Sequence, residues 1–253
     1  MQQQPWSFHN ETVWVTGAAR GIGRQIATQL QVAGAQVLGI DKQFAEETYP
    51  FDTALLDVRD PEQVAKKVQQ WFSSGLAPGR LVLAAGLLRS GTVETLSLEA
   101  WQDTFAVNLF GAVYLLRELF PHFKETRGVS VVAISSNAAR VPRLQMAAYC
   151  ASKAALTSLC QNLALELAPT GGRCNVVSPG STDTPMLRAL WHEEDGREKT
   201  IAGAPDQFKL GIPLQKIATT TEVANAVLFL LSDLASHITM QDLVVDGGAI
   251  LTA

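Results

Sequence analysis

The stretch Thr12-Val-Trp-Val-Thr-Gly-Ala-Ala-Arg-Gly-Ile-Gly23 decides the fold of this chain. Its first five residues are mostly β-branched or aromatic, which favours a strand. The glycines that follow let the backbone approach a pyrophosphate, and a helix starting at Gly21 would point free N–H groups at the phosphates. A strand, a glycine-rich turn and a helix in this order are typical of dinucleotide-binding folds, although the spacing GxxxGxG differs from the commoner GxGxxG. The candidate cofactor contacts in this turn are Gly17, Arg20, Gly21, Ile22 and Gly23.

Short apolar runs alternate with helical patterns along the rest of the chain. We expect strands over residues 12–16, 35–40, 80–84, 129–134, 173–177 and 242–246, and helices over 21–33, 61–73, 99–124, 146–167 and 221–232. Such alternation specifies a parallel sheet with helices on both faces, and nearly all-apolar strands fit burial on both sides. We therefore predict an α/β fold: a single-domain Rossmann-type, doubly wound parallel sheet with three α/β/α layers over residues 1–253. An irregular insertion at about 183–213 breaks the rhythm, and an insertion of this length is typically functional or mobile.

Composition narrows the class of protein. The 253 residues are 47% hydrophobic and 17% charged, with a net charge of -4, so nothing favours nucleic-acid or anionic-membrane binding. The longest apolar run, residues 81–88, is far too short to span a membrane, and the first ten residues do not resemble a signal peptide. Three cysteines without metal-ligand spacing are expected to be reduced thiols. These features predict a cytoplasmic protein without a metal site, a nucleic-acid partner or a membrane partner.

Two carboxylates follow expected strands on the cofactor side. Asp41 ends the second strand, where it can accept both hydroxyls of the adenosine ribose and repel a 2′-phosphate. We therefore expect NAD as the cofactor in preference to NADP, although Arg20 in the glycine turn is a counter-signal. Asp57 and Val58 end a further short apolar run and could lie near the adenine amino group, with an ordinary turn aspartate as the alternative.

The motif Tyr149-Cys-Ala-Ser-Lys153 points to the chemistry. Residues four apart lie on the same helix face, so the ammonium group of Lys153 can lie beside the phenol of Tyr149. A free phenol has a pKa of about 10, and a nearby cation favours the phenolate. The spacing therefore predicts a lowered Tyr149 pKa and a usable general acid/base, with a solvated tyrosine and lysine as the alternative.

Several separate motifs, in the right order, resemble the short-chain dehydrogenase/reductase family over nearly the whole chain. They are Thr16-Gly-Ala-Ala-Arg-Gly-Ile-Gly23, Asn108, Ser136, the Tyr149–Lys153 motif, Pro179-Gly180 and Val245-Asp-Gly-Gly248. The resemblance implies a nicotinamide cofactor and a homotetramer. One departure is Leu83-Ala-Ala-Gly86, which lacks an asparagine that braces the central sheet in the family.

The resemblance also implies roles for individual residues. Tyr149 would act as the general base, Ser136 would hold the reacting oxygen, and Lys153 would also bind the nicotinamide ribose. Asn108 would hold a water that links Lys153 to solvent, with a satisfied polar core residue as the alternative. Ser135 competes with Ser136 for the serine role. Further implied cofactor contacts are Ala85, Gly86, Pro179, Gly180, Thr182 and Thr184, the threonines being plain loop residues in the alternative interpretation.

Further stretches resemble a narrower group within the family that oxidises a carboxylated cyclohexadiene diol in catechol-siderophore synthesis, and two of them, 207–213 and 234–239, lie outside the motifs above. The stretches include residues 86–91, 141–146, 174–184, 207–213 and 234–239. An arginine suits a carboxylate by its bidentate geometry. Arg143 and Arg89 lie in segments on the carboxyl-end side of the sheet, so either could bind the substrate carboxylate. Met146 and Gln145 could line the ring pocket or pack in the core, and Trp191 could cap the substrate or pack locally.

Two other classes of function remain open at this point. A 3-oxoacyl-carrier reductase or a sugar-alcohol dehydrogenase could use the same fold and catalytic set. A catalytically silent dinucleotide sensor is the third interpretation, and the presence of Ser136, Tyr149, Lys153 and Asn108 together argues against it.

Overall fold

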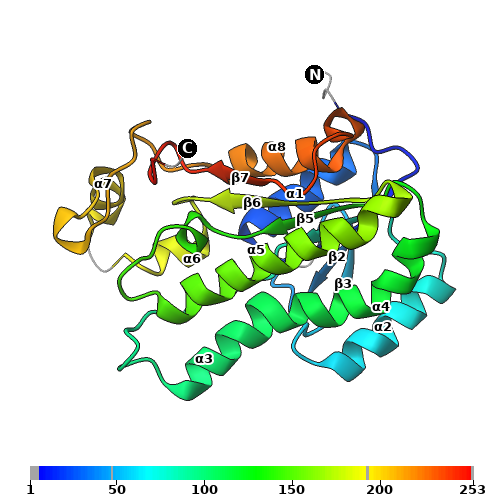
Figure 1. Ribbon diagram of the computed structural model, residues 1–253, viewed down its shortest axis with the longest axis horizontal. Helices are drawn as coiled ribbons and strands as arrows, with labels where there is room; N and C mark the ends of the chain where they lie inside the picture. The colour runs from blue at the N-terminus through cyan, green and yellow to red at the C-terminus, as the bar shows by residue number, and fades with distance from the viewer. Residues whose placement is uncertain (1–5, 47, 192–193, 252–253) are drawn as a thin grey trace.

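The computed structural model describes residues 6–46, 48–191 and 194–251. Its strands form one parallel seven-stranded sheet in the order β3-β2-β1-β4-β5-β6-β7 (Figure 1). The strands are β1 Thr12–Thr16, β2 Gln36–Asp41, β3 Asp52–Leu55, β4 Arg80–Leu83, β5 Ser130–Ile134, β6 Arg173–Pro179 and β7 Asp242–Val245. The strand order reverses between β1 and β4, and ligands bind at such a switch point, outside the carboxyl ends of the strands. The predicted α/β fold is confirmed.

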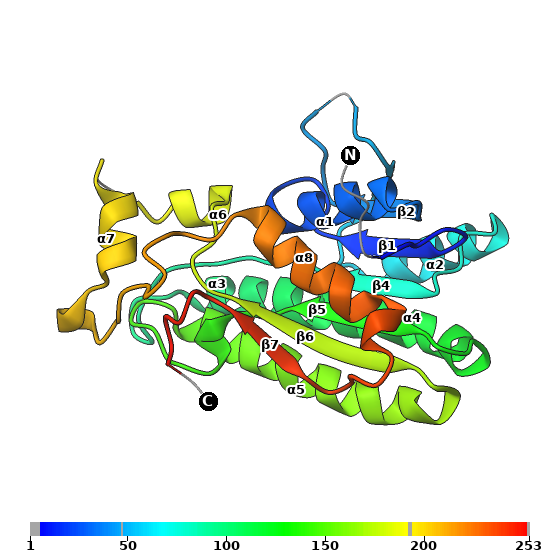
Figure 2. The ribbon, with the colours of Figure 1, turned by 90° about the horizontal axis from the view of Figure 1, so that it is seen from above.

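Helices cover both faces of the sheet. They are α1 Gly21–Val32, α2 Pro61–Ser73, α3 Leu98–Phe105, α4 Gly111–Glu125, α5 Ala147–Leu167, α6 Pro185–Arg188, α7 Gly196–Ala202 and α8 Thr220–Leu231. In Figure 2, α1 and α8 lie on one side of the sheet and α5 on the other. The helices α2 and α4 pack in the same core as α5, and so cover the same face. Across the described ranges, no helix combines the length and apolarity that crossing a bilayer requires.

The strand sequences build two cores at once. Successive strand side chains point to opposite faces, so Trp14 joins the core under α2, α4 and α5, while Val13 and Val15 join the core under α1 and α8. All three side chains are fully buried. This two-sided burial explains why the strands read as continuous apolar runs instead of alternating ones.

Three elements differ from the sequence-based expectations. No strand was predicted at β3, which carries a polar start and lies at the sheet edge. The helix expected over residues 99–124 is divided by a π-helical turn, Ala106–Phe110, which contains Asn108. The insertion 183–213, expected to be irregular, contains the short helices α6 and α7, which project beyond the carboxyl ends of the strands (Figures 1 and 2).

Thr16 braces the end of β4, in the segment Leu83–Gly86 that lacks the family asparagine. Its buried hydroxyl oxygen accepts hydrogen bonds from the backbone N–H groups of Ala84 (3.0 Å) and Ala85 (3.2 Å). It lies 3.4 Å from the carbonyl oxygen of Val82, to which it donates. One side chain of β1 thereby holds the end of β4 in place, directly beneath the glycine turn.

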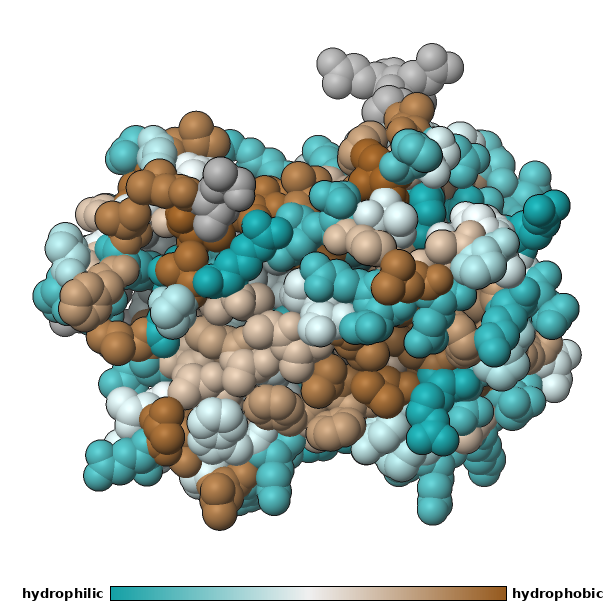
Figure 3. All heavy atoms as spheres, in the orientation of Figure 1, coloured by the Kyte–Doolittle hydropathy of each residue, from teal (hydrophilic) through white to brown (hydrophobic). Residues whose placement is uncertain are grey.

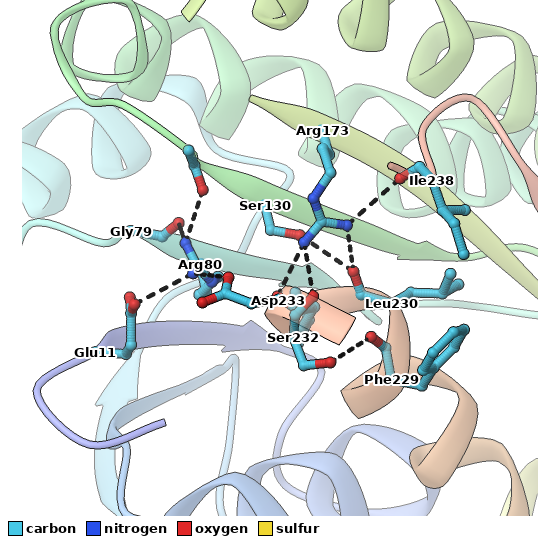
Figure 4. Close-up of polar contacts among 12 residues, drawn as sticks. Glu11, Gly79, Arg80, Ser130, Arg173, Phe229, Leu230, Ser232, Asp233 and Ile238 are labelled. Carbon is cyan, nitrogen blue, oxygen red and sulfur yellow. Dashed lines mark hydrogen bonds and ion pairs between the residues drawn. The ribbon is translucent and has the colours of Figure 1, made fainter. Parts of the chain in front are cut away.

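The opposite end of the sheet is held by a buried arginine. Arg173, at the start of β6, donates to the carbonyl oxygens of Leu230 (2.7 Å), Leu231 (3.2 Å) and Ser232 (3.0 Å), as Figure 4 shows in part. These are carbonyls at the C-terminal end of α8, which lack partners within a helix. The neighbouring Arg80 pairs with Glu11 in the same view. Arg173 therefore fastens α8 to the sheet at the end away from the cleft.

Candidate active site

A cleft of about 430 Å³ opens at the carboxyl ends of the strands. Its walls come from the glycine turn, the ends of β2, β4, β5 and β6, the start of α5 and the insertion 183–213. The residues predicted from sequence to contact cofactor or substrate that line it are Gly17, Arg20, Gly21, Ile22, Gly23, Asp41, Asp57, Val58, Ala85, Gly86, Arg89, Ser136, Arg143, Met146, Tyr149, Lys153, Pro179, Gly180, Thr182 and Thr184. The fold thus brings residues from most of the chain into one site.

The glycine turn has the geometry of a phosphate cradle. Gly17 has φ +69, and a Cβ there would lie 2.7 Å from the carbonyl oxygen of Ala84. A Cβ on Gly23 would lie 2.2 Å from the Gly17 carbonyl oxygen, so neither position accepts a side chain. No side chain caps the N-terminus of α1. Its first N–H groups are therefore available to an anion in the cleft, which fits the pyrophosphate of a dinucleotide.

The two predicted carboxylates lie at the same end of the cleft. Asp41 accepts a hydrogen bond from the N–H of Ala19 (3.0 Å), which turns its carboxylate toward the glycine turn. Asp57 binds the Arg59 guanidinium at 2.7 Å, and this hydrogen-bonded pair lowers the pKa of Asp57. Arg59 also lines the cleft. Sequence reasoning missed Arg59, although its position two residues after Asp57 was a usable signal.

Tyr149 and Lys153 share the inward face of α5, as their spacing predicted. Both are almost completely buried, and the Lys153 Nζ lies 5.9 Å from the centre of the Tyr149 ring. The Nζ donates a 2.8 Å hydrogen bond to the carbonyl oxygen of Ile134, at the end of β5. A Cβ on Gly86 would lie 3.6 Å from this Nζ, an ordinary van der Waals contact, so Gly86 lies directly beside the ammonium group.

The predicted lowering of the Tyr149 pKa is wrong for the structure as it stands. Burial raises the pKa of Tyr149 to about 12 and outweighs the opposing effect of a hydrogen bond with Ser136. Burial also lowers the pKa of Lys153 to about 8. Loss of hydration disfavours the charged form of both groups, and helix spacing alone does not reveal how deeply they are buried.

The geometry separates the two candidate serines. Ser136 lines the cleft and its Oγ accepts a hydrogen bond from the N–H of Ala138 (3.1 Å). Ser135 instead donates to the carbonyl oxygen of Lys153 (3.1 Å) and lies 2.8 Å from the hydroxyl of Thr157. The Ser135 hydroxyl is thus engaged with α5, whereas Ser136 faces Tyr149.

Asn108 lies behind the cleft and does not line it. Its Oδ1 accepts from the N–H of Leu87 (2.7 Å), and its Nδ2 donates to the Leu87 carbonyl oxygen (2.9 Å) and to Ser152 Oγ (2.9 Å). The side chain therefore pins the segment after β4 to α5. The predicted role of Asn108 in holding a water stays a prediction.

The remaining candidate residues were predicted to lie at the substrate end of the cleft. Arg143 is half-buried in the wall, whereas Arg89 is exposed at the rim. Neither Gln145 nor Trp191 lines the cleft. Of the alternatives left open, Trp191 agrees with local packing, and Gln145 lies neither in the ring pocket nor in the core. Gln145 is exposed, and its carbonyl oxygen accepts from the N–H of Gly91 (2.9 Å). Trp191 packs with Ile201 in a small separate core and donates from Nε1 to Thr200.

Sequence reasoning missed Lys209, which lines the same end of the cleft from the insertion. It lies in the stretch 207–213, one of those that resemble the narrower group within the family. A lysine between two apolar residues, Phe208 and Leu210, was the available signal. What the spacing could not reveal is that the insertion folds back over the cleft.

Comparison with known proteins assigns the class. The family described as enoyl-(acyl carrier protein) reductase matches residues 17–250. With its cofactor turn, Ser136, Tyr149 and Lys153 in one cleft, the chain belongs to the short-chain dehydrogenase/reductase family.

The chain is 53% identical to 2,3-dihydro-2,3-dihydroxybenzoate dehydrogenase of Escherichia coli, over 97% of this chain and 99% of that protein. The protein of the same name in Bacillus subtilis is 41% identical over 96% of this chain and 97% of its own length. A 3-oxoacyl-[acyl-carrier-protein] reductase of E. coli is 32% identical over 96% and 98%. Among solved structures, ligand-free aldohexose dehydrogenase of Thermoplasma acidophilum superposes with a TM-score of 0.87, at 35% identity and 98% and 97% coverage.

Proposed function

We propose that this protein oxidises 2,3-dihydro-2,3-dihydroxybenzoate to 2,3-dihydroxybenzoate with NAD. The observation that carries the proposal is the convergence of Tyr149, Ser136 and a phosphate cradle in one cleft. The substrate class rests on the relatives named for that diol, at 41% and 53% identity, against 32% for the 3-oxoacyl-carrier reductase. The half-buried Arg143 at the far end of the cleft suits a carboxylated substrate.

NAD fits the residues that line the cofactor end. The cradle at Gly17 and Gly23 would hold the pyrophosphate against the N-terminus of α1. The Asp41 carboxylate, turned toward that cradle, would accept the adenosine ribose hydroxyls and repel a 2′-phosphate. Pro179, Gly180, Thr182 and Thr184 line the wall where the nicotinamide end would lie.

The reaction divides between the cofactor and the protein. When bound, NAD would supply the hydride acceptor for the hydroxyl-bearing carbon and a positive charge that favours the phenolate form of Tyr149. Tyr149 removes the proton of the ring hydroxyl, and Ser136 donates a hydrogen bond to the same oxygen. Lys153, held by the carbonyl of Ile134, presents a cation to both the phenol and the ribose. The resulting ketone tautomerises to a catechol, and aromatisation drives the oxidation forward.

The direct test is NADH formation, measured by absorbance. We expect turnover with the carboxylated dihydrodiol and NAD, and much weaker turnover with an uncharged dihydrodiol or with NADP. Tyr149→Phe should lower kcat by about 10²- to 10⁴-fold, because it removes the general base but keeps the ring. A catalytically silent sensor would be indifferent to this change, and a preference for NADPH with 3-oxoacyl substrates would favour the reductase alternative.

The assembly and location follow from the same assignment. Figure 3 shows apolar residues gathered over α5 on the face turned to the viewer. Ala151, Ala154 and Leu165 of α5 are exposed. An apolar helix face of this kind supports a homotetramer built in part through α5. The three free cysteines and the use of NAD support a cytoplasmic location.

A further inference from the structure

Two cations converge on the substrate end of the cleft from different elements. Arg143 comes from the segment 137–146 between β5 and α5, and Lys209 comes from the insertion 183–213. Both are half-buried. Neither forms an ion pair with a carboxylate anywhere in residues 6–46, 48–191 and 194–251. Half-buried cations without a partner are uncommon, because burial of an unpaired charge is costly.

The backbone at each cation is fixed. Lys209 exchanges two backbone hydrogen bonds with Ala204, at 2.8 and 3.0 Å, and so closes a tight loop. That loop is seated on α7 through the Ile212 N–H, which donates to the carbonyl oxygen of Ile201 at 2.8 Å. On the other wall, Arg140 binds Asp242 at 2.8 Å and anchors the segment that carries Arg143. Both cations therefore lie on backbone segments that are fixed by hydrogen bonds or an ion pair, and both side chains line the same cleft.

The two charges also influence each other. Burial lowers the pKa of Lys209, and the positive charge of Arg143 lowers it further. Burial likewise lowers the pKa of Arg143, against a smaller opposing effect of Cys150 and Asp246. Like charges that face each other destabilise the site, and an anion between them would reverse the sign of the interaction. The arrangement has the electrostatics of an anion site.

We propose that Lys209 and Arg143 together bind the substrate carboxylate, and that Lys209 is a specificity-determining residue for acid substrates. This inference rests on the proposed function and deepens it. Arg143 can bind a carboxylate bidentately, while Lys209 adds a point charge from the insertion. Leu144, Met146 and Leu210 line the adjoining wall and would contact the ring. Because one cation is on the insertion and the other on the body of the protein, the carboxylate ties the two together.

The test compares an acid with its uncharged analogue. The variants are Lys209→Met, Lys209→Arg and the control Lys199→Met, which removes a lysine from the same insertion outside the cleft wall. The substrates are 2,3-dihydro-2,3-dihydroxybenzoate and the dihydrodiol without the carboxylate. We expect Lys209→Met to lower kcat/KM for the acid about 10- to 100-fold, as for loss of a hydrogen bond to a charged group. Turnover of the uncharged diol should change less than about threefold, and Lys209→Arg should keep most of the acid activity.

The result that overturns the inference is a Lys209→Met enzyme whose loss is equal for both diols, or which loses no more acid activity than Lys199→Met. Failure of the proposed function is a separate result, in which the wild type oxidises neither diol. In that case calorimetry with benzoate decides: loss of benzoate binding on Lys209→Met, with retention on Lys199→Met, supports the carboxylate site. Equal benzoate binding by both variants, or none by the wild type, refutes it.

Discussion

Tyr149 and Lys153 show that burial, more than their mutual spacing, sets their protonation. The phenol is 9% exposed and the lysine 3%. Burial raises the pKa of Tyr149 and lowers the pKa of Lys153, and both shifts favour the neutral form of the group. The lysine is positioned by the end of β5, through the carbonyl of Ile134, and not by the phenol. A buried lysine such as Lys153 lowers the stability of the fold but is needed for function, and this trade-off is common at active sites.

This trade-off gives a prediction for Lys153→Met. The unfolded chain holds the lysine proton up to about pH 10.4, whereas the folded protein releases it near pH 8. Below pH 8 both states are charged and the fold bears the full burial cost of about 3 kcal/mol. Between these values the unfolded chain binds more protons, so stability rises with pH as the cost is relieved. Lys153→Met should therefore raise Tm by a few degrees at pH 7, with a smaller gain at pH 10.

Thermal unfolding from pH 7 to 10 checks this prediction, with Lys66→Met as the control. Lys66 is exposed on α2, so its removal should leave Tm and its pH dependence unchanged. A Lys153→Met protein that is less stable than the wild type at pH 7 would contradict the argument.

Asp41 gives a second prediction at the scale of one residue. Asp41→Ser removes the charge that would repel a 2′-phosphate, and Arg20 in the adjacent turn can then attract that phosphate. We expect kcat/KM with NADP to rise at least about 10-fold, the effect of about 1.4 kcal/mol, while kcat/KM with NAD falls. Steady-state kinetics with both cofactors measure the change, and Asp52→Ser at the edge strand β3 is the matched control. An unchanged NAD to NADP ratio would refute the role of Asp41.

Among the elements, β1 and β4 are joined by strand pairing and, at the end of β4, by one side-chain hydroxyl. Thr16 accepts from two successive N–H groups after β4, and those groups lie directly under the glycine turn. Thr16→Val keeps the shape of the side chain but leaves these donors without an acceptor. The cost should be about 1–3 kcal/mol of unfolding free energy, measured by urea denaturation. Thr53→Val, at an exposed position of β3, should cost little. A stable Thr16→Val protein would show that other groups brace this strand.

The regular elements were the most predictable part of this fold, for a physical reason. A strand such as β5 is buried on both faces, so it consists of a nearly continuous run of apolar residues that can be recognised from the sequence alone. The long helix over residues 99–124 was predicted without its π-helical turn, because that turn is associated with a tertiary contact. Asn108 reaches Leu87 and Ser152, which are distant in sequence. The pattern of α3 and α4 does not encode those partners.

For the whole molecule, the proposed homotetramer can be tested at α5. The double variant Ala154→Glu, Leu165→Glu places two charges on the exposed apolar face of the helix without touching the cleft wall. We expect the mass in solution, measured by light scattering, to fall below that of a tetramer, because burial of unpaired charges at an interface is costly. Glu166→Gln beside this face is the control. An unchanged tetramer would place the interfaces elsewhere.

The cofactor half of the site was predictable from local sequence. The substrate half was predictable only in part, since Arg143, Arg89 and Met146 line the cleft as predicted but Lys209 was missed. Each cofactor-side feature lies within one strand, turn or helix, so local sequence determines its geometry. These features are the glycine spacing, Asp41 and the Tyr149–Lys153 motif. Lys209 reaches the cleft only because the insertion folds on its own small core around Ile212 and Trp191. That core forms from residues scattered over the last third of the chain, and no local periodicity marks it.

The hydrogen bonds of the buried Arg173 guanidinium can form only after α8 has been synthesised. Its acceptors are carbonyls of residues 230–232, about sixty positions downstream. In a nascent chain that has emerged only as far as β6, neither these acceptors nor α8 is present, so the guanidinium stays in water and the α8 face of the sheet is uncovered. Completion of the domain waits for α8 to leave the ribosome, and premature termination before Leu230 should yield a species that proteases remove.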